Sequence, residues 1–254
     1  MDGLRGRHAI VTGGGTGIGL AIAAALSDAG AKVTILGRRP EPLNTAVAAG
    51  RASAAEIADV TDEPALATAL ERARERNGTA AILVNAAGAA DSAAFLRTDA
   101  ALWDRMLRVN LLGAASTIRL ALPGMIAGGW GRVVNIASTA GLRGYPYVTA
   151  YTAAKHGLVG LTRALAQEVA TKGVTVNAIC PGFTDTEIVT ESVARIVDRT
   201  GRPAAEAQAE LTRHNPQGRL VRPQEVAATV LFLCGDAASA INGRAIAVDG
   251  GEVP

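Results

Sequence analysis

Short apolar runs alternate along the chain with longer segments in which apolar residues recur at helical spacing. A short apolar run bounded by turn residues is typical of a strand buried on both faces, whereas the longer segments are typical of amphipathic helices. The predicted strands are His8–Val11, Lys32–Leu36, Ala55–Ala58, Ala81–Val84, Arg132–Ile136, Thr175–Ile179 and Ala245–Val248. The predicted helices are Gly17–Ala29, Glu63–Arg76, Asp99–Leu120, Ala150–Thr171 and Pro223–Cys234.

Strands separated by helices form right-handed βαβ units, which build a parallel sheet with helices on both faces. The pattern therefore predicts an α/β chain with a doubly wound Rossmann fold and a seven-stranded parallel sheet. With no internal repeat and no linker, residues 1–254 are expected to form one domain. One polar helical insertion, at about residues 184–217, lies before the last strand and breaks at Asp198–Pro203. Because such sheets bind ligands at the carboxyl ends of their strands, we expect this insertion to be a substrate lid.

A glycine-rich turn joins the first predicted strand to the first predicted helix. It reads Thr12-Gly13-Gly14-Gly15-Thr16-Gly17-Ile18-Gly19, with the spacing G-x-x-x-G-x-G. At such a turn, backbone N–H groups and the helix dipole can hold a pyrophosphate. Taken alone, the segment could also be a loop without a ligand. The candidate cofactor-binding residues here are Gly13, Gly15, Thr16, Gly17, Ile18 and Gly19.

Tyr151 and Lys155 stand at positions i and i+4 of a predicted helix, which places their side chains on one face. An ammonium beside a phenol stabilises the phenolate, so we expect the pKa of Tyr151 to fall from about 10 towards working pH. Tyr151 could then exchange a proton with a substrate oxygen. Ser138, after the fifth predicted strand, could give that oxygen a second hydrogen bond. Most pairs of this spacing are solvated helix surface, but the glycine turn upstream favours the catalytic interpretation.

These two sites belong to a longer series of motifs. In order, the series is Thr12…Gly19, Asp59-Val60, Asn85-Ala86-Ala87-Gly88, Asn110, Ser138, Tyr151…Lys155, Pro181-Gly182…Thr186 and Val248-Asp249-Gly250-Gly251. With this series the chain resembles the short-chain dehydrogenase/reductase family over nearly its whole length, and bacterial 3-oxoacyl-thioester reductases most closely. One departure is Ala86, where the family usually carries a second asparagine. Ala86 keeps the backbone and loses a side-chain amide, so we expect the cofactor geometry to survive.

The resemblance implies roles for the segments after the third and fourth strands. The Asp59 carboxylate would bond the adenine amino group beside the Val60 backbone, and Thr61 could cap the helix that follows. Asn85 and Gly88 are expected beneath the cofactor ribose, and Ala86 between them is a further candidate cofactor-binding residue.

Further roles are implied for one helix and for the segment after the sixth strand. Asn110 lies mid-helix, where asparagine is unfavourable. Its amide would break the helical ladder and hold a water against Lys155, from which a proton relay begins. The nicotinamide carboxamide would meet the backbone after the sixth strand and bond Thr184 or Thr186, and the residues concerned are Pro181, Gly182, Thr184 and Thr186.

The end of the second predicted strand bears on the choice of nicotinamide cofactor. An NAD-specific site has a carboxylate there for the ribose hydroxyls, whereas a basic residue there accepts a 2′-phosphate. Here the chain reads Gly37-Arg38-Arg39, with no acid in reach. Two guanidinium groups suit planar, bidentate contact with a phosphate, so NADP(H) is favoured. NAD(H) remains an alternative, because no basic residue lies inside the glycine turn and the arginines could simply solvate the turn before Pro40.

The resemblance implies an oxidoreductase that reduces a ketone to a secondary alcohol, or catalyses the reverse reaction. The ketone oxygen would lie between Ser138 and Tyr151, with hydride from NADPH reaching its carbon and the Tyr151 proton reaching its oxygen. Lys155 would hold the phenolate, bond the nicotinamide ribose and pass protons onward through water and Asn110. A different class is an NADP-binding redox sensor without turnover, against which the complete acid/base set argues.

The expected substrate is a 3-oxoacyl thioester, carried by coenzyme A or by acyl-carrier protein. The uncharged turn Gly128–Gly131 weakens the carrier-protein case. The segment Leu142–Tyr147, with Tyr145 as a candidate substrate contact, is bulky and partly aromatic. It suits an acyl thioester, but also an aryl, cyclic or polyketide ketone.

Composition bears on which partners and which cellular compartment are expected. The 254 residues carry 25 basic and 23 acidic side chains that are scattered along the chain, so nucleic-acid binding is not expected. We find no apolar run of membrane-spanning length and no signal-peptide apolar region, so we expect a cytoplasmic protein without a membrane partner. Cys180 and Cys234 are expected to be buried, reduced thiols, with neither metal nor disulfide spacing.

The two long predicted helices bear on association. Apolar residues extend beyond one face of Asp99–Leu120 and Ala150–Thr171, which predicts that the chain associates, and the resemblance implies a homotetramer.

Overall fold

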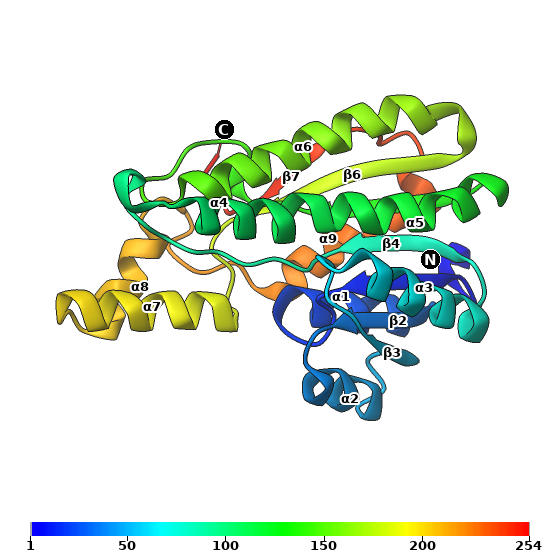
Figure 1. The fold of residues 1–254 in the computed structure, drawn as a ribbon, viewed down its shortest axis with the longest axis horizontal. Helices are drawn as coiled ribbons and strands as arrows, with labels where there is room; N and C mark the ends of the chain where they lie inside the picture. Colours follow the sequence, from blue (N-terminus) through cyan, green and yellow to red (C-terminus); the bar gives the residue numbers. More distant parts are fainter. Residues whose placement is uncertain (1, 254) are drawn as a thin grey trace.

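A computed structural model describes residues 2–253, all with side chains except Asp2, Ile188, Arg195, Ile196, Arg199 and Thr200. Seven parallel strands form one sheet in the order β3-β2-β1-β4-β5-β6-β7 (Figure 1). The strands are β1 (His8–Thr12), β2 (Lys32–Gly37), β3 (Ala54–Ile57), β4 (Ala80–Asn85), β5 (Gly131–Ile136), β6 (Val174–Pro181) and β7 (Ala245–Val248). The helices are α1 (Gly17–Asp28), α2 (Pro40–Ala48), α3 (Glu63–Asn77), α4 (Ala100–Leu107), α5 (Gly113–Ala127), α6 (Thr149–Val169), α7 (Glu187–Thr200), α8 (Ala204–Thr212) and α9 (Pro223–Cys234). The predicted parallel sheet and its strands are confirmed.

Alternating side chains along the strands divide the interior into two apolar cores, one on each face of the sheet. Val11 and Ile35 pack on one face with α1, α2 and α9. Their neighbours Ile10 and Leu36 pack on the other face with α3, α5 and α6. Because both faces are covered, the strands are mostly apolar, as the sequence pattern indicated.

The strand order reverses at β1, which lies between β2 and β4. The register pairs Thr12 at the end of β1 with Leu36 of β2 and with Asn85 of β4. The carboxyl ends of these three strands therefore lie side by side. In open α/β sheets ligands bind at such a switch point.

Helix α2 was not predicted from the sequence. It begins directly after Arg39 with Pro40, and Pro42 follows within the first turn. Proline is accepted there because the first N–H groups of a helix have no intrahelical partner. The two prolines therefore open a helix rather than marking only a turn.

The predicted helix Asp99–Leu120 is divided in two. A wider, π-type turn at Arg108–Leu112 separates α4 from α5, and α5 continues past Pro123 to Ala127. Met125, beyond the proline, is buried in the core with α3 and α6. This burial maintains the helix where local propensity predicts an end.

The whole stretch Ala100–Ala127 is long and apolar enough to cross a membrane by length and composition alone, with a mean hydropathy of 1.3. The sequence-based expectation was that no run has this property. Helices that cover a buried sheet share the same composition, and α5 packs against β4 and β5. We therefore describe it as one of the helical layers.

The insertion at residues 184–217 forms two helices, as predicted. Helix α7 ends at Gly201, whose φ of 67° is left-handed, and α8 begins after Pro203. The two helices pack against each other beside the sheet (Figure 1). A bridge between Thr184 and Val221 ties the two ends of the insertion together.

Candidate active site

The turn after β1 is tight because backbone meets backbone inside it. A Cβ on Gly19 would lie 2.2 Å from the carbonyl oxygen of Gly13, and a Cβ on Gly13 would lie 2.9 Å from the carbonyl oxygen of Ala86. Gly13 and Gly17 also have left-handed φ angles of 65° and 51°. No side chain caps the start of α1 at Thr16, so the N–H groups of its first turn remain available to a ligand.

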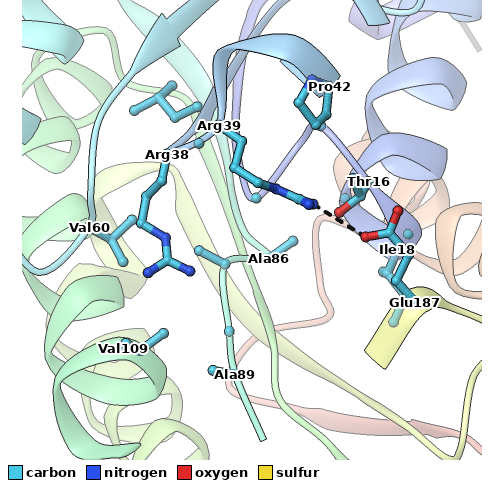
Figure 2. Close-up of a pocket in the computed structure, with 18 of the residues that line it drawn as sticks. Thr16, Ile18, Arg38, Arg39, Pro42, Val60, Ala86, Ala89, Val109 and Glu187 are labelled. Carbon is cyan, nitrogen blue, oxygen red and sulfur yellow. Dashed lines mark hydrogen bonds and ion pairs between the residues drawn. The ribbon is translucent and has the colours of Figure 1, made fainter. Parts of the chain in front are cut away.

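A cleft of about 510 Å³ opens at this turn (Figure 2). Its volume is in the usual range for small-ligand sites, roughly 300 to 1,000 Å³. Its walls come from the glycine turn, the end of β2, the segments after β3 and β4, and the start of α7. The predicted cofactor residues that line it are Gly13, Gly15, Thr16, Gly17, Ile18, Gly19, Arg38, Arg39, Asp59, Val60, Ala86, Gly88 and Thr186.

Four predicted cofactor residues at the ends of β4 and β6 are not part of this lining. Asn85 is buried in the sheet and donates from Nδ2 to Asn135 Oδ1 at 2.9 Å. Asn85 thus links the ends of β4 and β5 inside the protein, and its place beneath the cofactor ribose stays a prediction. Pro181, Gly182 and Thr184 belong to the end of β6 and the loop that follows, where the Thr184 hydroxyl donates to the Gly182 carbonyl at 2.9 Å. These three residues belong to the segment that leads into α7. Of the four residues predicted in this segment, Thr186 is the one that lines the cleft.

Ser138 and Tyr151 come together as predicted. Ser138 follows β5, and Tyr151 lies in the first turn of α6, close enough to Ser138 for the serine hydroxyl to act against the burial of the phenol and lower its pKa. Ser138 Oγ also accepts the N–H of Ala140 at 3.1 Å, which fixes its rotamer. Both residues therefore lie at the carboxyl end of the sheet.

Lys155 lies in the wall between this pair and the cleft. Its side chain is buried, and Nζ donates to the Ile136 carbonyl at 2.9 Å. Nζ lies 5.6 Å from the centre of the Tyr151 ring. Ile136 and Gly88 both line the cleft, and a Cβ on Gly88 would be 3.7 Å from the Lys155 nitrogen. Lys155 thus lies one layer behind the cleft surface and beside Tyr151.

Burial dominates the ionisation of this site. It lowers the pKa of Lys155 to about 8, because an ammonium is costly in a low-dielectric interior. Burial also raises the pKa of Tyr151, and the neighbouring Ser138 hydroxyl opposes that rise without cancelling it. The sequence-based expectation of a lowered Tyr151 pKa is therefore wrong for this arrangement. The reason is that Lys155 donates to a backbone carbonyl, so desolvation of the phenol prevails.

Asn110 interrupts the helical ladder, as predicted. It lies in the π-type turn, where Nδ2 donates to the Met106 carbonyl at 3.0 Å and to the Ala89 carbonyl at 2.9 Å. Its Oδ1 accepts the Ala89 N–H at 3.2 Å. Asn110 therefore fixes the segment after β4 that lines the cleft, and its part in a proton relay stays a prediction.

A family model described as enoyl-(acyl carrier protein) reductase matches residues 13–252, nearly the whole chain. The chain belongs to the short-chain dehydrogenase/reductase family. It is accordingly an oxidoreductase with the Rossmann fold expected from its sequence.

Full-length relatives agree with this assignment. A D-beta-hydroxybutyrate dehydrogenase from Cupriavidus necator is 39% identical, over 98% of this chain and 99% of that protein. An acetoacetyl-CoA reductase from Rhizobium meliloti is 38% identical, over 97% of this chain and 98% of that protein. The crystal structure of a single-residue variant of actinorhodin polyketide ketoreductase with NADPH superimposes with a TM-score of 0.93 at 36% identity, covering 97% of each chain.

The two arginines after β2 of this reductase-family enzyme face carboxylates. Arg38 Nη1 lies 3.8 Å from Asp59 Oδ2, and Arg39 Nη2 donates to Glu187 Oε2 at 3.3 Å (Figure 2). The expectation that no acid is in reach of these arginines is therefore wrong. The acids come from the end of β3 and from the start of α7, which only the tertiary fold brings to β2.

Asp59 also organises its own turn. Its Oδ1 accepts both the N–H and the hydroxyl of Thr61, at 2.9 and 2.8 Å. Thr61 is therefore engaged by Asp59 and does not cap the next helix. The cap of α3 is Asp62, which accepts the N–H of Ala65 at 3.1 Å.

Two aromatic side chains, Tyr145 in the segment before α6 and Phe183 in the loop after β6, contact each other. Tyr145 donates from Oη to Glu252 Oε1 at 2.5 Å, and its ring meets that of Phe183 edge to face, with centroids 6.5 Å apart. Burial, and then the hydrogen bond to Glu252, raises the pKa of Tyr145, so it is a neutral phenol near neutral pH. Thr139, the residue after Ser138, lies near Tyr145 and acts in the opposite direction on its pKa. A substrate contact by Tyr145 stays a prediction.

Sequence reasoning missed several cleft residues: Pro42, Leu43, Asp91, Glu187 and Glu191. The first two were missed because α2 was not predicted, although the two prolines after the arginines were a signal for its start. An acid directly after Thr186 was visible, but nothing in the sequence indicated that it faces β2.

Histidines and cysteines contribute to structure. His8 is buried and bonds the Gly78 carbonyl at 2.6 Å and Thr34 Oγ1 at 2.9 Å. Cys180 and Cys234 are buried and free, and burial raises the pKa of Cys180 to about 11. Among the described residues, no three His, Cys, Asp or Glu side chains are grouped as metal ligands would be.

Proposed function

We propose that this enzyme reduces a ketone to a secondary alcohol with NADPH, or catalyses the reverse reaction, with Tyr151 as the general acid/base. The observation that carries the proposal is the placement of Ser138 beside Tyr151, with the buried Lys155 next to both Tyr151 and the cleft lining at Ile136 and Gly88. Relatives that are named for hydroxybutyrate oxidation and acetoacetyl-CoA reduction support the same chemistry. A non-enzymatic redox sensor would have no use for this pair.

The residues of the cleft fit a nicotinamide dinucleotide. The free N–H groups at the start of α1 would hold its pyrophosphate, and Asp59 would meet the adenine. The guanidinium groups of Arg38 and Arg39 suit a 2′-phosphate, which favours NADP(H) over NAD(H). Lys155, behind Gly88, would reach the nicotinamide ribose. When bound, the nicotinamide supplies or accepts the hydride.

The protein's own part is to hold and protonate the carbonyl oxygen. Ser138 and Tyr151 would each donate a hydrogen bond to it, which draws the ketone carbon towards the cleft. A raised pKa keeps Tyr151 protonated at neutral pH, which is the form that reduction requires. Lys155, mostly charged below its pKa of about 8, then stabilises the phenolate left behind.

For the substrate we favour a 3-oxoacyl thioester, because an acetoacetyl-CoA reductase matches the chain over nearly its full length. The second candidate is an aryl, cyclic or polyketide ketone. The edge-to-face pair of Tyr145 and Phe183 would suit a flat substrate, and a polyketide ketoreductase is among the structural relatives.

The test is NADPH oxidation by the purified enzyme with acetoacetyl-CoA, a cyclic ketone and an aryl ketone. Crotonyl-CoA serves as a control, since its reduction would indicate C=C chemistry and contradict the proposal. Tyr151→Phe is expected to lower kcat by about 100-fold or more while NADPH binds within a few-fold of wild type. A variant that keeps a tenth of the activity would exclude Tyr151 as the acid. Parallel assays with NADH measure the cofactor preference.

We further propose that the enzyme is a cytoplasmic homotetramer. Leu112 and Ile126, on the stretch from α4 to α5, are 52% and 38% exposed, which leaves apolar surface for a partner subunit. Free, buried cysteines suit a reducing compartment. Light scattering of the eluting protein would give its mass, and a monomer would contradict the assembly.

A further inference from the structure

One ion pair spans the cofactor cleft. Arg39 donates from Nη2 to Glu187 Oε2 at 3.3 Å, although 148 positions separate them in the sequence. Both residues line the cleft. Figure 2 shows Arg39 extending past Thr16 to reach Glu187, whereas Arg38 points the other way, towards Val60 and Val109. The pair therefore connects the two walls between which the adenosine end of a dinucleotide would lie.

This pair is weaker than the contact that a phosphate could make in its place. The side chains of Arg39 and Glu187 are 66% and 62% exposed, and exposed ion pairs contribute little. A phosphate offers the guanidinium two parallel, charge-assisted hydrogen bonds. A 2′-phosphate can therefore displace Glu187 from Arg39. The displaced carboxylate remains on the cleft wall, because Glu187 lies in the first turn of α7, where the helix dipole favours its charge.

The geometry points to Glu187 as a cofactor-selectivity residue that competes with the 2′-phosphate for Arg39. This inference rests on the proposed use of NADP(H). A phosphorylated cofactor must break the Arg39–Glu187 pair and then lie near an unpaired carboxylate, whereas an unphosphorylated ribose leaves the pair intact. Glu187 therefore reduces the preference for NADP(H) that the two arginines create. It acts at the adenosine end, away from Ser138 and Tyr151.

The test uses two fragments without a nicotinamide, adenosine 2′,5′-bisphosphate and 5′-AMP, whose dissociation constants are measured by calorimetry. Glu187→Gln removes the competing charge and nearly preserves the shape of the side chain. The matched control is Glu41→Gln, because Glu41 is exposed, lies two positions after Arg39, and is not part of the cleft lining. We expect Glu187→Gln to bind the bisphosphate about three- to tenfold more tightly, while binding of 5′-AMP stays within about twofold. For Glu41→Gln, we expect the ratio of the two constants to stay within about twofold of wild type.

The same change in an Arg39→Gln background separates competition from a general field effect. Without Arg39 there is nothing to compete for, so Glu187→Gln is expected to bring no further gain for the bisphosphate. A gain that persists there, or an equal gain in Glu41→Gln, overturns the inference.

A failure of the proposed use of NADP(H) can be distinguished from a failure of the proposed role of Glu187. If wild type binds both fragments equally and Arg39→Gln changes neither constant, the proposed use of NADP(H) is wrong and this inference falls with it. If wild type prefers the bisphosphate through Arg39 but Glu187→Gln does not raise that preference, only the role of Glu187 is wrong.

Discussion

The cofactor side of the site is built mainly from backbone, whereas the substrate side is built from side chains that come from distant parts of the chain. On the cofactor side, Gly13, Gly19 and Ala86 meet at distances that no Cβ would allow. On the substrate side, Tyr145 bonds Glu252, 107 positions further along the chain, and its ring meets that of Phe183 from the loop after β6.

The two sides should therefore respond differently to substitution. A backbone contact leaves no space for a larger residue, so changes there act as all-or-none events. A side-chain contact can be replaced by one of similar shape, so changes there are graded. This difference would let a family keep one cofactor site while its substrate range varies. Lys155 lies between the two sides and touches both, through Ile136 and through the Tyr151 ring.

The largest effect is expected from a substitution on the cofactor side. Gly19→Ala would place a methyl group 2.2 Å from the Gly13 carbonyl oxygen, so we expect a loss of stability of about 3 kcal/mol or more together with loss of NADPH binding. Denaturant unfolding and fluorescence titration measure the two quantities. Gly15→Ala is the control, because its nearest new contact is the Pro42 side chain at 3.2 Å. If the two variants lost stability and NADPH affinity equally, close backbone contacts would not be what restricts substitution in this turn.

The next largest effect is expected from Lys155, which lies between the cofactor side and the substrate side. Lys155 has a pKa of about 8 when folded and about 10.4 when unfolded, so between these values the unfolded chain holds a proton that the folded chain has released. Wild-type stability should therefore rise relative to Lys155→Met as pH increases from about 8 to about 10, by about 1.4 kcal/mol per pH unit.

Urea unfolding of both proteins at about pH 7, about pH 8.5 and about pH 9.5 measures this difference. The variant should also lose turnover at every pH. A stability difference that stays constant across the series would mean that the buried amine does not titrate in this range.

The smallest effect is expected on the substrate side. Tyr145→Phe leaves the buried carboxylate of Glu252 without its donor, so we expect a loss of about 1 to 3 kcal/mol in stability and a higher substrate KM. Glu252→Gln keeps an acceptor oxygen for Tyr145 and should cost less in both quantities. NADPH binding should stay unchanged in both variants, and a matching change in NADPH affinity would contradict the separation of the two sides.

The sequence alone determined the features that are local in the chain. The parallel strands followed from apolar runs, the glycine turn from its spacing, and the Tyr151–Lys155 face from positions i and i+4. Asn110 could be identified as a break in its helix because asparagine is unfavourable there and the family resemblance marked it. In each case the physical cause lies within a few residues, or in the simple rule that both faces of a parallel sheet are covered.

Tertiary structure decided what depends on residues far apart in the sequence. It placed Glu187 against Arg39 and Glu252 against Tyr145, contacts that no local pattern encodes. It also reversed the expected shift in the pKa of Tyr151, because the depth of burial and the direction of Lys155 are set by the packing of α6 on the sheet. Spacing along a helix specifies which side chains share a face, but desolvation depends on everything packed against that face.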